Sequence, residues 1–290
     1  MTETTPRPIQ AAPGFFASGL RIFDLSLSEM LWSRRTIFMM LVVGAPVVIA
    51  ALLRLFVWFG APVFESHRTG GEGSQTIRMT GPAIFGLMIW VFYLRFTVPV
   101  LGVFYGTSLM ADEVEDKTIT YLFTRPIRRG AVLLGKFLAY FVCTVMVVLP
   151  SLMIVYFLMG LSGSTLAATF PSLLKDLGLI VLGLLAYGGL FAWVGAQFKR
   201  PLVIGLIFVF GWEQLAMVIP GYLRQATVSY YLQSMVPHAV MGEGVLSVLQ
   251  SLVATKASLA TSLIMLVGIG AGFVVLAMRV IARREYVLEQ

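Results

Sequence analysis

Long runs of apolar residues constrain this chain more than any other feature of its sequence. Six such runs can be drawn, each with about 20 residues or more, which is the length of helix that crosses about 30 Å of hydrocarbon. Of the 290 residues, 58% are hydrophobic and 12% are charged, about half the charged fraction of an ordinary soluble protein. The short alternating runs of a membrane barrel are absent. The sequence therefore predicts an all-α polytopic membrane protein that forms a single domain, 1–290.

The distribution of lysine and arginine predicts how the chain is oriented. The six expected spans are 36–59, 82–109, 132–160, 173–198, 201–222 and 257–281. With the N-terminus inside, the inner segments hold 14 of the Lys and Arg residues, the outer segments hold 5, and 2 lie within spans. Because cytoplasmic loops are rich in Lys and Arg, both termini are expected in the cytoplasm. The net charge of +7 is spread beside the spans, so it indicates topology and not a nucleic-acid partner.

The segments before and after the first span differ in composition, and each composition predicts a different structure. Residues 1–18 contain three prolines and no apolar run ahead of a cleavage site, so we expect a flexible tail and no cleaved signal peptide. Residues 19–35 place their apolar side chains on one face and their polar ones on another. This pattern favours an interfacial helix on the inner membrane surface, with an ordinary cytoplasmic lead-in as the alternative. Residues 60–81 are polar and rich in glycine, which predicts a loop.

The outer segment 223–256 predicts a cap over the outer face. Pro220-Gly221 breaks the fifth apolar run, and the apolar stretches that follow are too short to cross a membrane. We expect short re-entrant or interfacial helices here. In the last span, Gly268 and Gly272 have the spacing that allows close helix contact.

A charged insert, 110–131, separates the second and third spans. Four acids, at positions 112, 113, 115 and 116, lead into a short stretch of helical pattern that Pro126 ends. Acids in a first turn favour a helix N-terminus, and such a helix cannot lie in hydrocarbon. Residues alone leave two interpretations open, a helix presented to an aqueous partner or a solvated loop that follows the positive-inside rule.

The insert also resembles a known pattern. From Glu113 through Lys136 the chain reads E-x-x-D-K-T-x-x-x-L-x-T-R-P-x-x-R-x-x-x-L-x-G-K. This run is similar to that of ABC transporter permeases of the type-2 exporter family, with Lys117 where glycine is commoner in the family. Its setting between the second and third of six spans, after an amphipathic helix, extends the resemblance over essentially the whole chain.

The resemblance implies a function and partners. In that family the insert is a cytoplasmic coupling helix that docks on a separate ATP-hydrolysing subunit, and two permease copies work with two ATPases in the cell (inner) membrane. The second and fifth spans line the cavity of such proteins, and the segment before the last span forms a cap. The positions that match the coupling pattern, or belong to its acidic start, are Asp112, Glu113, Glu115, Lys117, Thr118, Leu122, Arg125, Pro126 and Arg129.

Two charges are expected deep within the spans. Arg95 falls near the middle of the second span and Glu213 near the middle of the fifth. Each alone would cost about 2.5–3.5 kcal/mol or more at the bilayer centre, so we expect them to face a cavity or gate, or to form a structural ion pair. Arg54 lies near the outer end of the first span, where its side chain can reach the membrane surface.

Catalysis by this chain is not expected. Gly130 to Lys136 matches part of a phosphate-binding loop, but Phe137 stands where that loop needs a hydroxyl. The sequence shows no nucleophile–base grouping, and its single cysteine, Cys143, gives neither a disulfide nor a cysteine metal site. We expect no cofactor, with ATP hydrolysis on the partner subunit and membrane lipid around the spans.

The expected function is therefore a membrane-spanning exporter subunit whose substrate the sequence does not identify. Two alternatives remain. One is a non-transporting mechanotransmission or anchor subunit, which predicts no continuous polar pathway. The other is an ion-coupled secondary transporter that uses Arg95 and Glu213 and needs no ATPase.

Overall fold

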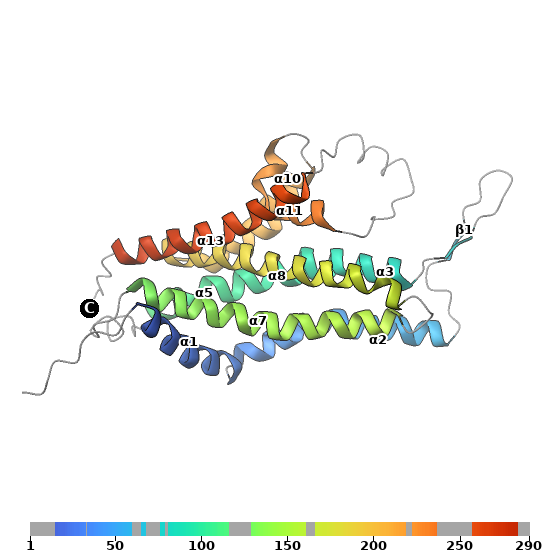
Figure 1. Cartoon of the computed structure of the whole chain (residues 1–290), viewed down its shortest axis with the longest axis horizontal. Coiled ribbons are helices and arrows are strands. Elements are labelled where there is room, and N and C mark those ends of the chain that lie inside the picture. The colour runs from blue at the N-terminus through green and yellow to red at the C-terminus, as the bar shows by residue number, and fades with distance from the viewer. Residues whose placement is uncertain are drawn as a thin grey trace, which may run out of the picture.

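The chain forms an elongated bundle of helices in a computed structural model (Figure 1). The structure describes residues 15–32, 34–59, 65–67, 76–78, 81–115, 129–160, 166–218, 222–236 and 257–283. Within these ranges, five helices are long and apolar enough to cross a membrane. They are Thr36–Phe56, Ile84–Ala111, Gly130–Gly160, Thr169–Gln197 and Leu259–Arg283.

Each of these helices matches one predicted span. The first lies in α2 (Arg34–Trp58), the third in α7 (Arg129–Gly160), the fourth in α8 (Leu166–Gln197) and the last in α13 (Leu259–Arg283). The second is a continuous run of helical segments with two π-helical turns. Its segments are α3 (Gly81–Met88), η1 (Ile89–Thr97), α4 (Val98–Leu101), η2 (Gly102–Gly106) and α5 (Thr107–Glu115).

The second and fourth candidate spans form the core of the bundle. Each has 67% of its most apolar window buried, against 33%, 39% and 22% for the first, third and last. Tyr187 and Phe191 of α8 pack against Gly102 and Gly106 of η2, where a side chain would meet them at 3.3 Å or less. Because glycine has no side chain, the second span lies directly on the aromatic rings of α8.

The last span also meets α8 through glycine, at Gly270 and not at Gly268 or Gly272. A Cβ atom added to Gly189 of α8 would lie 2.3 Å from the carbonyl oxygen of Gly270, so the two backbones are in direct contact. A Cβ at Gly268 or Gly272 would meet nothing within 4 Å in the described structure. Gly270 lies between these two on the helix, and the rotation of α13 turns Gly270 toward α8. Gly268 and Gly272, whose spacing allows close helix contact, make none within the described part of this chain.

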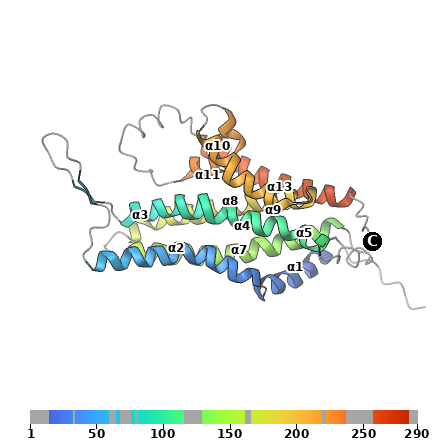
Figure 2. The same ribbon diagram turned by 180° about the vertical axis from the view of Figure 1, so that it is seen from behind.

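The N-terminal helix α1 (Phe15–Trp32) packs against the start of α7. A Cβ at Gly135 would lie 2.6 Å from the carbonyl oxygen of Gly19 and 3.0 Å from Ile22. Leu20 and Leu25 remain 64% and 70% exposed, so the helix has an apolar outer face as well as a packed one. Helix α1, the last turn of α5, the first turn of α7 and the C-terminal end of α13 all lie at one end of the bundle (Figures 1 and 2). Residues 1–14 of the predicted tail lie outside the described residues.

Within the described residues, the predicted fifth span is shorter than expected, and the count of six is not confirmed. Its apolar part, Pro201–Ala216, is about 24 Å long at 1.5 Å per residue and falls short of about 30 Å of hydrocarbon. It comprises α9 (Pro201–Ile207), the π-helical η3 (Phe208–Trp212) and α10 (Glu213–Val218). Residues 219–221, the next part of the predicted span, lie outside the described residues.

Two of the connecting segments contain short elements. Within the segment predicted as a loop, β1 (Glu65–His67) and β2 (Thr76–Arg78) form an antiparallel hairpin with Ser66 opposite Ile77. The segment 223–256 contains most of the 3₁₀ turn η4 (Tyr222–Ala226) and helix α11 (Val228–Met235). Residues 237–256 of the predicted cap lie outside the described residues.

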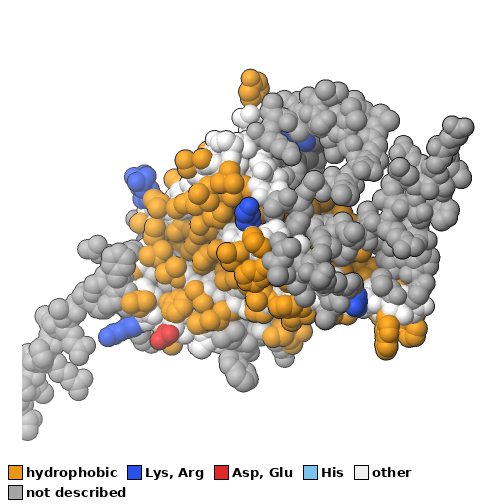
Figure 3. All heavy atoms as spheres, turned by 45° about the vertical axis from the view of Figure 1, so that its right-hand side comes forward, with side chains coloured by type: hydrophobic (Ala, Val, Ile, Leu, Met, Phe, Trp, Pro, Cys, Tyr) orange, Lys and Arg blue, Asp and Glu red, His pale blue; other side chains and the backbone are white. Residues whose placement is uncertain are grey.

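The surface of the bundle is largely apolar. Ile37, Leu41 and Val48 of α2 are 70%, 69% and 58% exposed. Figure 3 shows apolar side chains over much of one face, with only scattered charged groups among them. A soluble protein rarely exposes so much contiguous apolar surface, whereas lipid covers it without cost. The five long helices and this surface fit a multi-pass membrane protein.

Candidate functional site: a polar pocket beside the second span

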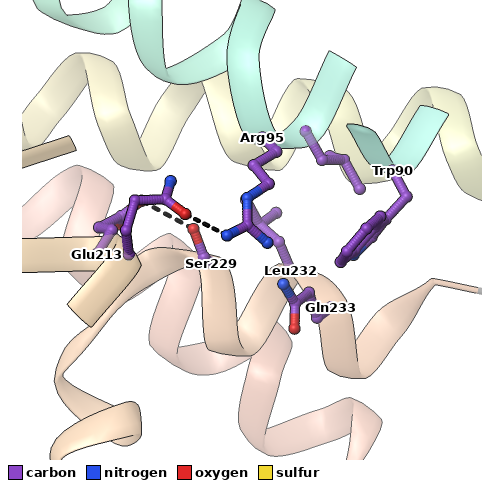
Figure 4. A pocket seen from close by; sticks show the side chains of 8 residues that line it. Trp90, Arg95, Glu213, Ser229, Leu232 and Gln233 are labelled. Atoms are coloured by element: carbon purple, nitrogen blue, oxygen red, sulfur yellow. Dashed lines mark hydrogen bonds between the residues drawn. The ribbon is translucent and has the colours of Figure 1, made fainter. Parts of the chain in front are cut away.

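The two charges predicted within the spans line one pocket. Its walls come from η1, α10 and α11 (Figure 4). The lining residues are Trp90, Leu94, Arg95, Glu213, Gln214, Ser229, Leu232 and Gln233. The enclosed space is about 10 Å³, close to the volume that one water molecule needs. In this conformation the pocket does not admit a larger solute.

Arg95 is held by an amide and an aromatic ring. Its side chain is partly exposed. The guanidinium group donates a hydrogen bond to Oε1 of Gln214, and its central carbon lies 5.5 Å from the centre of the Trp90 ring. A cation over an aromatic face within about 6 Å is stabilised by the ring's electron density. These contacts keep a positive charge at the side of the second span.

Glu213 is held at the start of α11. It is only 2% exposed. Its Oε2 accepts hydrogen bonds from the hydroxyl groups of Tyr187, on α8, and Ser229, the latter at 2.7 Å. The backbone amides of Val228 and Ser229, the first two residues of α11, also hydrogen-bond to this carboxylate. The positive end of the helix dipole therefore stabilises the carboxylate. Glu213 thus joins three elements, α8, α10 and α11.

No ion pair joins Arg95 to Glu213 in the described part of the chain, and each has another partner. The structure places both candidates in one pocket, with Arg95 bound to Gln214, the residue after Glu213. The second carboxylate oxygen of Glu213, Oε1, has no hydrogen-bond partner among the described residues. The pocket therefore offers a buried acceptor on one wall and a cation on another.

Two π-helical turns adjoin the pocket. Trp90 and Arg95 lie within η1, and η3 ends at Trp212, directly before Glu213. A π turn adds one residue to a helical turn and so rotates the side chains that follow by about 100°. Such turns often occur at functional sites, because they redirect side chains out of a regular helix face. Here they turn charged residues of two apolar helices toward a common space.

The predicted coupling residues lie mostly beyond the described part of the structure. The helical backbone of the second span continues without a break through Asp112, Glu113 and Glu115 to the end of α5, and Arg129 is the first residue of α7. Their side chains are not described. Lys117, Thr118, Leu122, Arg125 and Pro126 lie outside the described residues.

Sequence reasoning missed several polar residues of the bundle. Tyr187 and Ser229 carry no charge, and no pattern in the sequence indicates that they meet Glu213. Gln214 could have been found from the sequence, because it follows Glu213 directly and the two are adjacent polar residues in an otherwise apolar run. Asp176 of α8 is fully buried. Its position within the fourth predicted span was a signal in the sequence, because an acid in an apolar run is a candidate functional residue.

The fold and the pocket are those of a multi-pass membrane protein, a single helical bundle with a polar site beside its core. The family model described as "ABC-2 family transporter protein" matches residues 28–286. The chain therefore belongs to the ABC-2 family of transporter proteins, whose members are membrane transport components. This confirms the family that the insert resembles. A search of the curated proteins found no match.

Proposed function

We propose that this chain is the permease subunit of an ATP-driven exporter and forms half of a translocation pathway. The observation that carries the proposal is the pocket, which Arg95 and the buried acceptor of Glu213 both line within a bundle of the ABC-2 family. Charges in a membrane bundle are costly, so they are retained where they line a pathway or its gate. Arg95 and Glu213 are the cavity or gate residues of this proposal.

A second copy of the chain completes the pathway. Arg95 is partly exposed at the side of the second span, and so are Phe96 and Trp212, at 42% and 39%. Lipid against the guanidinium would cost about 2.5 kcal/mol or more, whereas a polar cavity between two copies would hydrate it. The short helix Pro201–Ala216 then acts as the fifth of six spans, sheltered by the partner copy from part of the hydrocarbon.

A separate cytoplasmic ATPase drives the cycle through the segment 110–131. Support comes from the arrangement of the bundle, because α5 and α7 deliver this segment to the end that also holds α1 and the C-terminal end of α13 (Figure 1). That end carries Arg21, Arg279 and Arg283, as the cytoplasmic side of a cell (inner) membrane protein does. Helix α1 is the interfacial helix, and α11 belongs to the outer cap.

The test reverses charges in the proposed coupling helix. Glu113→Lys with Glu115→Lys should insert normally but weaken the complex with the co-purifying ATPase about tenfold or more, because interface charges of the wrong sign repel. The control is Asp24→Lys with Glu29→Lys, which makes the same charge change at exposed positions of α1 at the same end. Complex formation and ATP-dependent transport unchanged in the first variant would refute the coupling role.

A further inference from the structure

The polar pocket contains a buried carboxylate oxygen without a hydrogen-bond donor. Among the described residues, Oε1 of Glu213 has no partner, although Oε2 of the same carboxylate accepts from Tyr187 and Ser229. Burying an acceptor in this way is unfavourable, so each such atom in a native structure requires an explanation. Glu213 lines the pocket, and a ligand in that space can supply the missing donor.

The size of the space limits which chemical group can reach this oxygen. About 10 Å³ holds one group as large as a water molecule. An ammonium group is of that size and carries three N–H donors, so it can donate to Glu213 and to a second acceptor. The side-chain amide of Gln233, on the same pocket wall as Ser229, offers an oxygen for this purpose (Figure 4). A trimethylated ammonium is larger and has no N–H to donate.

The guanidinium of Arg95 determines the other part of the ligand. Arg95 lines the pocket and is partly exposed, so a group too large for the enclosed space can lie against it. The hydrogen bond to Gln214 leaves other N–H donors of Arg95 for phosphate or carboxylate oxygens. Arg95 repels a ligand that is only a cation, and Glu213 repels one that is only an anion. A ligand with both charges meets an opposite charge on each wall.

We propose that the pocket binds the head of a zwitterionic primary amine, with its ammonium at Oε1 of Glu213 and its phosphate or carboxylate at Arg95. The inference rests on the proposed function, because it names the class of solute that the pathway carries. Phe96 and Trp212, which neighbour the two charged residues in the chain, are 42% and 39% exposed. This apolar surface suits the rest of an amphiphile such as an aminophospholipid, and a soluble zwitterion presents the same head alone.

A comparison of two lipids tests the ligand without any substitution. Phosphatidylethanolamine and phosphatidylcholine with identical acyl chains differ only in the methylation of the ammonium. In native mass spectrometry, the purified full chain with any subunits that co-purify should retain phosphatidylethanolamine about tenfold better. This is the difference expected when one hydrogen bond to a charged group is lost. Equal retention of the two lipids would overturn the proposal.

A soluble competitor distinguishes the two sources of the head. Glycerophosphoethanolamine carries the same ammonium and phosphate without acyl chains. If it displaces phosphatidylethanolamine at a similar concentration, the head alone is recognised and a soluble zwitterion is a sufficient ligand. If the lipid stays bound, the ligand is the membrane amphiphile. Both results support the same head chemistry.

Two variants assign the two parts of the ligand to their walls. Glu213→Gln should lower retention of phosphatidylethanolamine about tenfold and leave that of phosphatidylcholine unchanged, because the neutral amide no longer attracts the ammonium. Arg95→Gln should lower retention of both lipids, since both carry the phosphate. Asp24→Asn and Arg279→Gln are matched controls that make the same charge changes at exposed positions outside the pocket. Equal losses in a variant and its control would overturn the proposal.

Failure of this inference is separable from failure of the proposed function. Retention is measured without ATP and without transport. Equal retention of the two lipids would remove the zwitterionic ligand and leave the exporter proposal standing. Unchanged transport in Glu113→Lys with Glu115→Lys would remove the coupling role and leave the lipid preference as measured.

Discussion

At the scale of single residues, Glu213 shows how a carboxylate is accommodated in an apolar bundle without a cation. Burying an isolated charge is expensive, and the usual remedy is an ion pair. Glu213 instead accepts hydrogen bonds from Tyr187 and Ser229 at the start of a helix. The same contacts fasten α11 to α8 and α10. Arg95 is left with Gln214 and Trp90, so the two charges can respond separately to a solute or to a movement of α11.

Substitutions at Glu213 should separate its hydrogen bonding from its charge. Glu213→Gln keeps an oxygen that accepts from Tyr187 and Ser229, so we expect a loss of folding free energy below about 1 kcal/mol. Glu213→Leu removes the shared acceptor. The Tyr187 and Ser229 hydroxyls lie 2.9 Å apart, so one can donate to the other and the remaining donor loses its partner, which should cost about 1–3 kcal/mol. Thermal unfolding of the purified chain, with Tyr187→Phe as an intermediate case, measures the difference.

The same series tests whether Arg95 and Glu213 depend on each other. With no ion pair between them, Arg95→Met combined with Glu213→Met should be no more stable than Glu213→Met alone. Two results together would contradict this: a double variant more stable than Glu213→Met, and a Glu213→Gln variant as destabilised as Glu213→Leu. They would show that the two charges pair in the native membrane.

At the scale of elements, close helix contacts depend on which glycine faces a neighbour. Gly189 and Gly270 allow α8 and α13 to touch backbone to backbone. Close approach of this kind increases van der Waals contact, which drives helix association in lipid in place of the hydrophobic effect. Gly268 and Gly272 have the familiar spacing and lie on the open side of the same helix.

Valine substitutions should reveal the difference between these positions. Gly189→Val places side-chain atoms within 2.3 Å of the Gly270 carbonyl oxygen and must push the helices apart. We expect a loss of about 2 kcal/mol, typical of overpacking. Gly268→Val is the matched control and should change stability by less than about 0.5 kcal/mol. Thermal unfolding measures both, and equal losses at the two positions would show that the open face of α13 is covered in the assembled protein.

At the scale of the whole molecule, the bundle has two unlike ends. One gathers α1, the ends of the segment 110–131 and the end of α13, while the other carries the β1–β2 hairpin (Figure 1). Asymmetry of this kind is what a protein needs when it receives a signal on one side of a membrane. The polar pocket is built from α10, α11 and the second span, so a movement of the second span at α5 reaches η1 through one continuous helical run.

Cysteine labelling tests the orientation directly. Cys143 is 1% exposed, and Cys143→Ser gives a background without cysteine. Single cysteines at positions 24 and 120 should react with an impermeant reagent only after the membrane is opened, and cysteines at positions 70 and 163 should react in intact cells. Reaction at position 120 from the outside would reverse the topology and remove the coupling proposal with it.

The sequence by itself determined the class of protein, five of the long helices and the family. These follow from properties that are local in the chain, because a span needs only an apolar run of sufficient length and the 113–136 pattern is contiguous. Arg95 and Glu213 were also visible in this way, as charges in apolar runs. Tertiary structure decided what surrounds them. The packing of α8, α10 and α11 brings together Tyr187, Glu213 and Ser229, which are distant in sequence. The rotation of α13 about its axis places Gly270, and not Gly268, against α8. Such choices depend on how whole helices are placed against one another, which the local pattern does not encode.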